Sequence, residues 1–183
     1  MKMCIKDFTT VLTTVLTAVV ALSYSGSAFQ LNGTQTFTVT VNSAMSITSP
    51  SGGNAVLAHD TTDANQSFSA SDTDWDVISN SGTGATVTFT NSGLFTNTVG
   101  SNIYTRNLTM DLTETTDTDN VWAVSGPTTF TSTSGTTTGS LQAVSTGPGH
   151  ATLGLNVTFL DTDYSLLPAG SYVMTVTGTI AAN

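Results

Sequence analysis

The chain has 183 residues, 12 acidic side chains against three Lys and Arg, and a formal net charge of −9. This length suits one domain with a hydrophobic core, and the charge disfavours nucleic acid and anionic membrane surfaces as partners, because almost nothing can neutralise phosphate. Threonine is far more abundant than in an ordinary globular protein, as are serine, asparagine and glycine, which is the composition of a durable extracellular β-protein.

The N-terminal segment has the layout of an export signal. Two lysines precede an apolar run over residues 8–22, and small residues follow up to Ala28. We expect cleavage after Ala28, which removes residues 1–28 as a signal peptide and leaves one secreted domain of residues 29–183. The apolar run is shorter than the roughly 20 residues of a membrane span, so we expect no membrane anchor in the mature form. Cleavage also removes Cys4, the only cysteine, so the fold has no disulfide.

Residues 34–42, "TQTFTVTVN", have the alternation of a β-strand. Phe37, Val39 and Val41 point one way and threonines point the other. Two interpretations follow. The segment is either the first strand of the subunit's own sandwich or, within residues 29–48, a strand donated to a neighbouring subunit.

Four later segments repeat this alternation of apolar and threonine-rich faces. They are "ATVTFTN" at 85–91, "NLTMDLT" at 107–113, "TLGLNVTF" at 152–159 and "SYVMTVTGTI" at 171–180. Antiparallel sheets with one face in water require this pattern, and turn signals rich in glycine, proline, serine and asparagine separate the segments. Residues 128–140 form either a hairpin or a threonine-rich loop. We predict an all-β protein, an antiparallel β-sandwich of the Ig-like or jelly-roll type.

Each of the two tryptophans has two interpretations. Trp75 opens a predicted strand that leads into a glycine-rich turn, and Trp122 lies in "DNVWAVSGP". Either ring can pack across the core of the sandwich or serve as a stacking platform for a sugar.

Short acidic clusters are the candidates for a metal site. The stretch "DTDWD" begins like a calcium loop, but Val77 stands in place of the turn glycine and Thr83 in place of the closing carboxylate, so it is not an EF-hand. These aspartates either bind an extracellular calcium ion or cap turns and keep strand edges soluble. We expect no other cofactor. The calcium candidates are Asp72, Asp74, Asp76, Asp117, Asp119, Asp161 and Asp163.

No set of residues indicates catalysis. His59 and His150 are the only imidazoles, and no serine lies in a G-x-S-x-G elbow. Glu114 and the scattered aspartates do not single out the carboxylate pair of a glycosidase, and two histidines without a cysteine in the mature chain do not indicate a zinc site. We predict no enzyme activity.

The two ends of the mature chain carry a family resemblance. Residues 34–48, "TQTFTVTVNSAMSIT", and residues 167–180 of the closing stretch "LPAGSYVMTVTGTIAAN" resemble bacterial surface β-sandwich subunits, most closely chaperone-usher pilins of the spore-coat-U type. The composition is also similar to that of disulfide-free, TasA-like filament subunits. The resemblance implies assembly by donor-strand complementation, in which an extended segment of one subunit completes the sandwich of the next.

Two functional hypotheses follow. The first is a structural subunit of an extracellular filament, pilus-like fibre, surface layer or biofilm matrix, whose partners are copies of itself and whose interface residues are Phe37, Val39 and Val41. The second is a monomeric secreted adhesin or carbohydrate-binding module that uses Trp75 or Trp122 on a glycan or cell surface.

Overall fold

The computed structural model describes residues 34–183, and the expected signal peptide lies outside this range. The chain forms two units, one ending at Thr40 and a compact body of Val41–Asn183. Within residues 34–183, the structure contains no helix with the length and apolar character that crossing a membrane would need.

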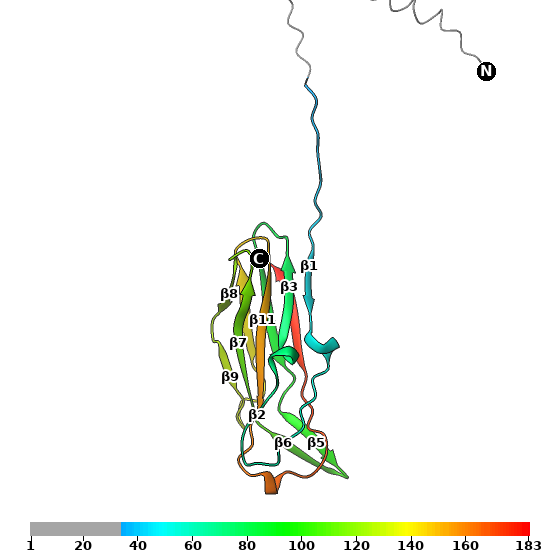
Figure 1. The fold of residues 1–183 in the computed structure, drawn as a ribbon, viewed down its shortest axis with the longest axis vertical. Helices are drawn as coiled ribbons and strands as arrows, with labels where there is room; N and C mark the ends of the chain where they lie inside the picture. Colours follow the sequence, from blue (N-terminus) through cyan, green and yellow to red (C-terminus); the bar gives the residue numbers. More distant parts are fainter. Residues whose placement is uncertain (1–33) are drawn as a thin grey trace, which may run out of the picture. The chain divides into compact units, whose positions relative to one another are not determined.

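Two antiparallel sheets make up most of the body (Figure 1). The first has the strand order β1-β3-β11-β7-β9, with a short β2 also paired to β11, and the second has the order β12-β4-β10-β8. In the first sheet the strands are β1 Met45–Thr48, β2 Gln66–Ser67, β3 Asp74–Ser79, β7 Leu108–Asp117, β9 Thr129–Thr131 and β11 Gly149–Phe159. In the second they are β4 Ala85–Asn91, β8 Trp122–Ser125, β10 Ser140–Ser145 and β12 Val176–Ala182.

Smaller elements complete the body. A separate hairpin pairs β5, Phe95–Val99, with β6, Asn102–Arg106. Three short 3₁₀ turns lie in the connections, namely η2 Pro50–Gly53, η3 Ala70–Asp72 and η4 Tyr164–Leu166.

The core lies between the two sheets and is built from alternate residues of their strands. Val87 and Phe89 of β4 are fully buried, as are Leu108 and Met110 of β7 and Leu153 of β11. The intervening threonines lie on the outer faces, because successive side chains of a strand point to opposite sides of a sheet. The prediction of an all-β antiparallel sandwich is confirmed. Strands β4 and β11 contain the segments predicted from their alternation, and β7 contains all of its predicted segment except residue 107.

Two segments with alternative interpretations, 34–42 and 128–140, and the start of the last predicted strand take the following form in the structure. Residues 34–42 do not form a strand, and the first strand is β1; alternation gives a segment the pattern of a strand, but pairing needs a partner, and no pairing of the described residues includes 34–42. The last strand begins at Val176 rather than at residue 171, preceded by an isolated bridge between Val173 and Thr96. Residues 128–140 contain β9 and then a tight turn closed by Thr133 and Thr136.

The two long sides of the sandwich differ. On one side, β8 and β9 follow each other in the chain but belong to different sheets, so residues 126–128 cross from one sheet to the other. On the other side lie β1 and β12, edge strands from the two ends of the body, with no chain connection between them (Figure 1). We call the first side the closed edge and the second the open edge.

Candidate functional site

The open edge carries a groove of about 520 Å³ between the two sheets. Its walls come from the start of β12, the stretch after β1, the start of β3 and the far half of β11. The apolar side chains that line it include Ile47, Phe68, Trp75, Val157, Met174 and Val176. Most of these are only partly buried, although they pack against the core.

Gly178 sets the width of the groove at one end. A Cβ atom at this position would lie 2.7 Å from Cδ1 of Ile47 and 2.9 Å from Cζ3 of Trp75. The missing side chain therefore lets β1 and β3 approach β12 closely there. At Val176 and Met174, further from this contact, the groove stays open.

Trp75 belongs to both the core and the groove. Its ring packs edge-on against Phe89 with centroids 5.1 Å apart, and it also lines the groove. Trp122, by contrast, is 4% exposed and lies in the core at the closed edge. It therefore offers no ring face to a ligand, and only Trp75 keeps the position that a stacking role requires.

The N-terminal arm, residues 34–42, contains the predicted interface residues. The exposed fractions are 81% for Phe37, 87% for Val39 and 78% for Val41. Large apolar side chains of a folded protein are rarely this exposed in a row. Within the body, Asn80 holds the residues before β1, because its side chain donates to Asn42 O and accepts from Ala44 N.

Six of the seven calcium candidates, all except Asp74, have hydrogen bonds or ion pairs of their own. Asp163 caps η4 by accepting from Ser165 N, and Asp72 accepts from the Ser69 hydroxyl. Asp119 accepts from His150 N. Among the described residues, no three His, Cys, Asp or Glu side chains are grouped as a metal site would need.

Asp117 organises the turn that leads into β8. Its carboxylate accepts from Trp122 N at 2.8 Å and from Asp119 N at 3.0 Å. Desolvation raises the pKa of Asp117, but the backbone N–H groups around it together outweigh this, so the pKa lies below the ordinary carboxyl value. The ionised carboxylate of Asp117 therefore holds the turn at the closed edge.

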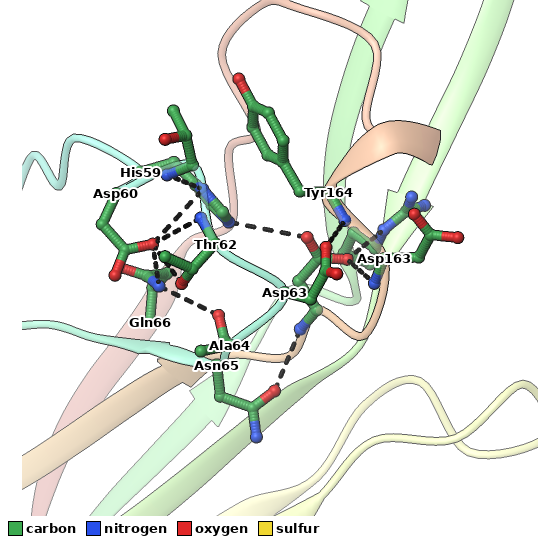
Figure 2. A network of polar contacts seen from close by, with 12 residues as sticks. His59, Asp60, Thr62, Asp63, Ala64, Asn65, Gln66, Asp163 and Tyr164 are labelled. Carbon is green, nitrogen blue, oxygen red and sulfur yellow. Dashed lines mark hydrogen bonds and ion pairs between the residues drawn. The ribbon is translucent and has the colours of Figure 1, made fainter.

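A polar cluster that sequence analysis did not identify joins two loops at the base of the body (Figure 2). Asp161, with 2% of its side chain exposed, lies 3.6 Å from Nε of Arg106 and 3.6 Å from Nε2 of His59. Asp63 accepts from Tyr164 N, and Asn65 accepts from the backbone N of Asp161. The sequence held one signal for it: Arg106 is the only Lys or Arg after residue 6, and a lone cation in an acidic chain is the natural partner of its most buried carboxylate.

Local hydrogen bonds shape one of these two loops. Asp60 accepts from the hydroxyl and backbone N of Thr62 and from the Gln66 amide (Figure 2). These bonds, that of the Thr62 hydroxyl first, hold the pKa of Asp60 below its ordinary value. His59 stacks on Tyr164 with ring centroids 5.2 Å apart. The cluster thus holds the loops together.

Each of the two imidazoles contacts an aspartate. His59 faces Asp161, and His150 contacts Asp76 across neighbouring strands. The Nδ1 atom of His59 also accepts a hydrogen bond from Thr61 N.

The class that the fold defines is an antiparallel all-β sandwich with one open edge. No protein-family model, curated protein or solved structure matches the chain.

Proposed function

We propose that this chain is a non-enzymatic structural subunit of an extracellular assembly, such as a filament, a surface layer or a biofilm matrix. In this proposal the subunits are secreted, and copies join through the N-terminal arm by strand exchange. Phe37, Val39 and Val41 are the anchors at each junction.

The observation that carries the proposal is the exposure of these three side chains on a segment without a strand partner. Fully burying one side chain of this size is worth about 1.5–3 kcal/mol. Three of them at two-residue spacing can enter one apolar surface together, since alternate residues of an extended segment point the same way. The ladder of backbone hydrogen bonds would add direction to the junction.

The low charge of the described chain also supports the proposal. Strands coated with threonine rather than with charges can pack against copies of themselves without strong repulsion. Asp163 and Asp60 lie in loops and shape the local backbone there, whereas Asp74 and Asp76 lie in β3 and Asp111 and Asp117 lie in β7.

The test measures the mass of the exported full chain over a concentration series by light scattering, with negative-stain microscopy of the same samples. We compare Phe37→Asp/Val39→Asp with Thr38→Asp/Thr40→Asp, which adds the same charge to the opposite face of the arm. We expect the wild type and the threonine variant to assemble and the first variant to stay monomeric. A wild type that is monomeric at every concentration, or equal assembly of both variants, would contradict the proposal.

The second candidate function is that of a monomeric secreted adhesin or carbohydrate-binding module. The observation that favours it is the half-buried ring of Trp75 in the groove, since aromatic faces stack on apolar faces of sugars. Retention on glycan-coated beads by a monomeric protein, lost in Trp75→Ala but kept in Trp75→Phe, would favour it over assembly.

A further inference from the structure

We infer that His59 and Thr61 form an acid-sensitive latch at the base of the body. In this latch, the backbone N–H of Thr61 is bound to Nδ1 of the neutral His59 ring, and uptake of a proton by the ring releases it. The ring then binds the carboxylate of Asp60 instead, and the loop of residues 59–65 changes its conformation. The latch lies within the polar cluster of Figure 2 and does not depend on how copies of the chain assemble.

The hydrogen bond from Thr61 determines which nitrogen of the neutral ring carries the proton. Thr61 N donates to Nδ1 of His59 at 3.0 Å, so Nδ1 presents a lone pair. A neutral imidazole has one protonated nitrogen and one acceptor nitrogen, and the proton therefore lies on Nε2. That atom faces Oδ2 of Asp161 at 3.6 Å. Both atoms are buried, and neither has another hydrogen-bond partner within residues 34–183.

Uptake of a proton removes the acceptor that Thr61 uses. Histidine is the side chain whose charge ordinarily changes between about pH 5 and pH 8, and a protonated imidazole has an N–H group at each nitrogen. Nδ1–H and the N–H of Thr61 would then face each other as two donors. Oδ1 of Asp60 lies 4.0 Å from Nδ1 and can accept from it after a small movement. Nε2 keeps its position, because a positively charged ring is attracted more strongly to Asp161.

The backbone conformation of Thr61 favours opening of the latch. Its φ is 65°, in the left-handed region, where a β-branched residue is strained. The other non-glycine residue of the described chain with a positive φ is Asn120, and asparagine adopts this region more easily. The hydrogen bond to His59 helps to hold Thr61 in the strained conformation. When that bond is lost, Thr61 can relax to an ordinary φ.

Asp60 connects the latch to the first sheet. Its Oδ1 accepts from the hydroxyl and the backbone N of Thr62 and from the amide of Gln66. These bonds, that of the Thr62 hydroxyl first, keep the pKa of Asp60 below its ordinary value, so Asp60 is still an anion when an imidazole takes up a proton. Gln66 begins β2, whose two residues pair with the end of β11. A turn of Asp60 toward His59 therefore also weakens a contact of β2.

The other charged groups near the ring have partners of their own. Asp161 follows β11, and its second carboxylate oxygen lies 3.6 Å from Nε of Arg106 at the end of β6. Asp63 and Asp163 accept from backbone N–H groups of η4, and the Tyr164 ring of the same turn stacks on the imidazole. Arg106 opposes a positive charge on the ring, and the surrounding carboxylates favour it. The ring can therefore take up a proton and keep its place beside Asp161.

Nuclear magnetic resonance tests the latch. The sample is the exported chain carrying Phe37→Asp and Val39→Asp, so that the result does not depend on assembly, and spectra are recorded between about pH 5 and pH 8. We expect the ring nitrogen shifts of His59 to show a neutral ring protonated at Nε2, and the amide signal of Thr61 to shift with the same midpoint as the ring. A neutral ring protonated at Nδ1, or a Thr61 amide that does not follow the ring, would overturn the inference.

Two substitutions separate the latch from a general effect of acid. His59→Asn places an amide oxygen near the position of Nδ1 but cannot take up a proton, so we expect the Thr61 amide signal to stop shifting with pH. His150→Gln is the matched control, because it removes the other histidine of the described chain, and the Thr61 signal should shift as before. If the Thr61 signal still titrated in His59→Asn, or stopped titrating in His150→Gln, the latch would be wrong.

A third substitution, Thr61→Gly, keeps the latch testable if His59→Asn does not fold. Glycine adopts a φ of 65° without strain, and its N–H can still donate to Nδ1. The closed latch then loses its strain, so a lower pH is needed to open it. We expect the amide signal of residue 61 to shift at a lower pH than in the parent chain. A midpoint that stays the same or rises would show that strain at Thr61 does not favour opening, and would overturn the inference.

Discussion

The closed and open edges of the sandwich show how chain connection determines whether a sheet edge is complete. At the closed edge, β8 and β9 are adjacent in sequence, residues 126–128 carry the chain from one sheet to the other, and Trp122 at the start of β8 is buried. At the open edge, β1 and β12 come from opposite ends of the body, and Trp75 lines a groove. A short loop joins the two sheets at the closed edge, whereas β1 and β12 end their sheets without a loop between them.

The largest effect is expected at the closed edge. Trp122→Ala would remove a buried ring from the core and leave a cavity, at a cost of about 3–5 kcal/mol in the free energy of unfolding. Urea denaturation followed by circular dichroism measures this. Because Trp122→Phe keeps most of the apolar volume, we expect it to lose much less. If Trp122→Ala lowered the free energy of unfolding by less than about 1 kcal/mol, the ring at the closed edge would be no more important for stability than the ring at the open edge.

The equivalent change at the open edge should cost less. Trp75 is half-buried, so Trp75→Ala should lower the free energy of unfolding by about 1–2 kcal/mol in dilute solution, less than full burial would give. The same denaturation series at high protein concentration should show a larger loss, since an arm seated on the ring would add to its burial. If the loss does not depend on concentration, Trp75 has no role at a junction.

The substitution Asp117→Asn tests whether the charge of the Asp117 carboxylate stabilises the turn at the closed edge. Losing a charged acceptor for Trp122 N and Asp119 N should cost about 0.5–1 kcal/mol at neutral pH, since solvent screens this site. The folded-state pKa of Asp117 lies below its ordinary value of 3.8, so its contribution is present above that pH and is lost as pH falls through the folded-state value. The difference between wild type and variant, measured by thermal unfolding, should therefore shrink in acid. A difference that grows below pH 3.8 would show the opposite sign of shift.

The smallest effect on folding is expected in the arm. Val39 is 87% exposed, so Val39→Ala should leave the free energy of unfolding of the monomer within about 0.5 kcal/mol of wild type. Its effect should be on the concentration at which subunits assemble, measured by light scattering. A clear destabilisation of the monomer would show that the arm packs on its own body, and the open edge would then be complete without a partner.

The sequence correctly predicts the strands whose apolar side chains pack in the core of the same chain. Strand β4 has the expected apolar face, and so do β7 and β11, because Phe89, Met110 and Leu153 have partners across the core. The same pattern in residues 34–42 left the subunit's own strand and a donated strand as alternatives, and the segment is unpaired in the structure, since periodicity does not specify a partner. Trp75 and Trp122 had identical interpretations from sequence, and only the topology separates the ring at the groove from the ring in the core.

The groove and the polar cluster were beyond sequence reasoning for a related reason. Both bring together residues far apart in the chain, such as Ile47 with Gly178 and Arg106 with Asp161. No local pattern encodes such a distance. The isolation of Arg106 in an acidic sequence was the one clue, and it indicates that a partner exists without saying which aspartate it is.

Arg106 has one more consequence. It is the only residue after position 6 at which trypsin can cut, and it lies at the end of β6 with its guanidinium bound to Leu166 O. Cleavage there requires the base of the body to open, so a single cut into two fragments reports how often that region unfolds. In the extracellular assembly proposed above, a single guarded cleavage site for proteases of this specificity would favour a long lifetime of the subunit.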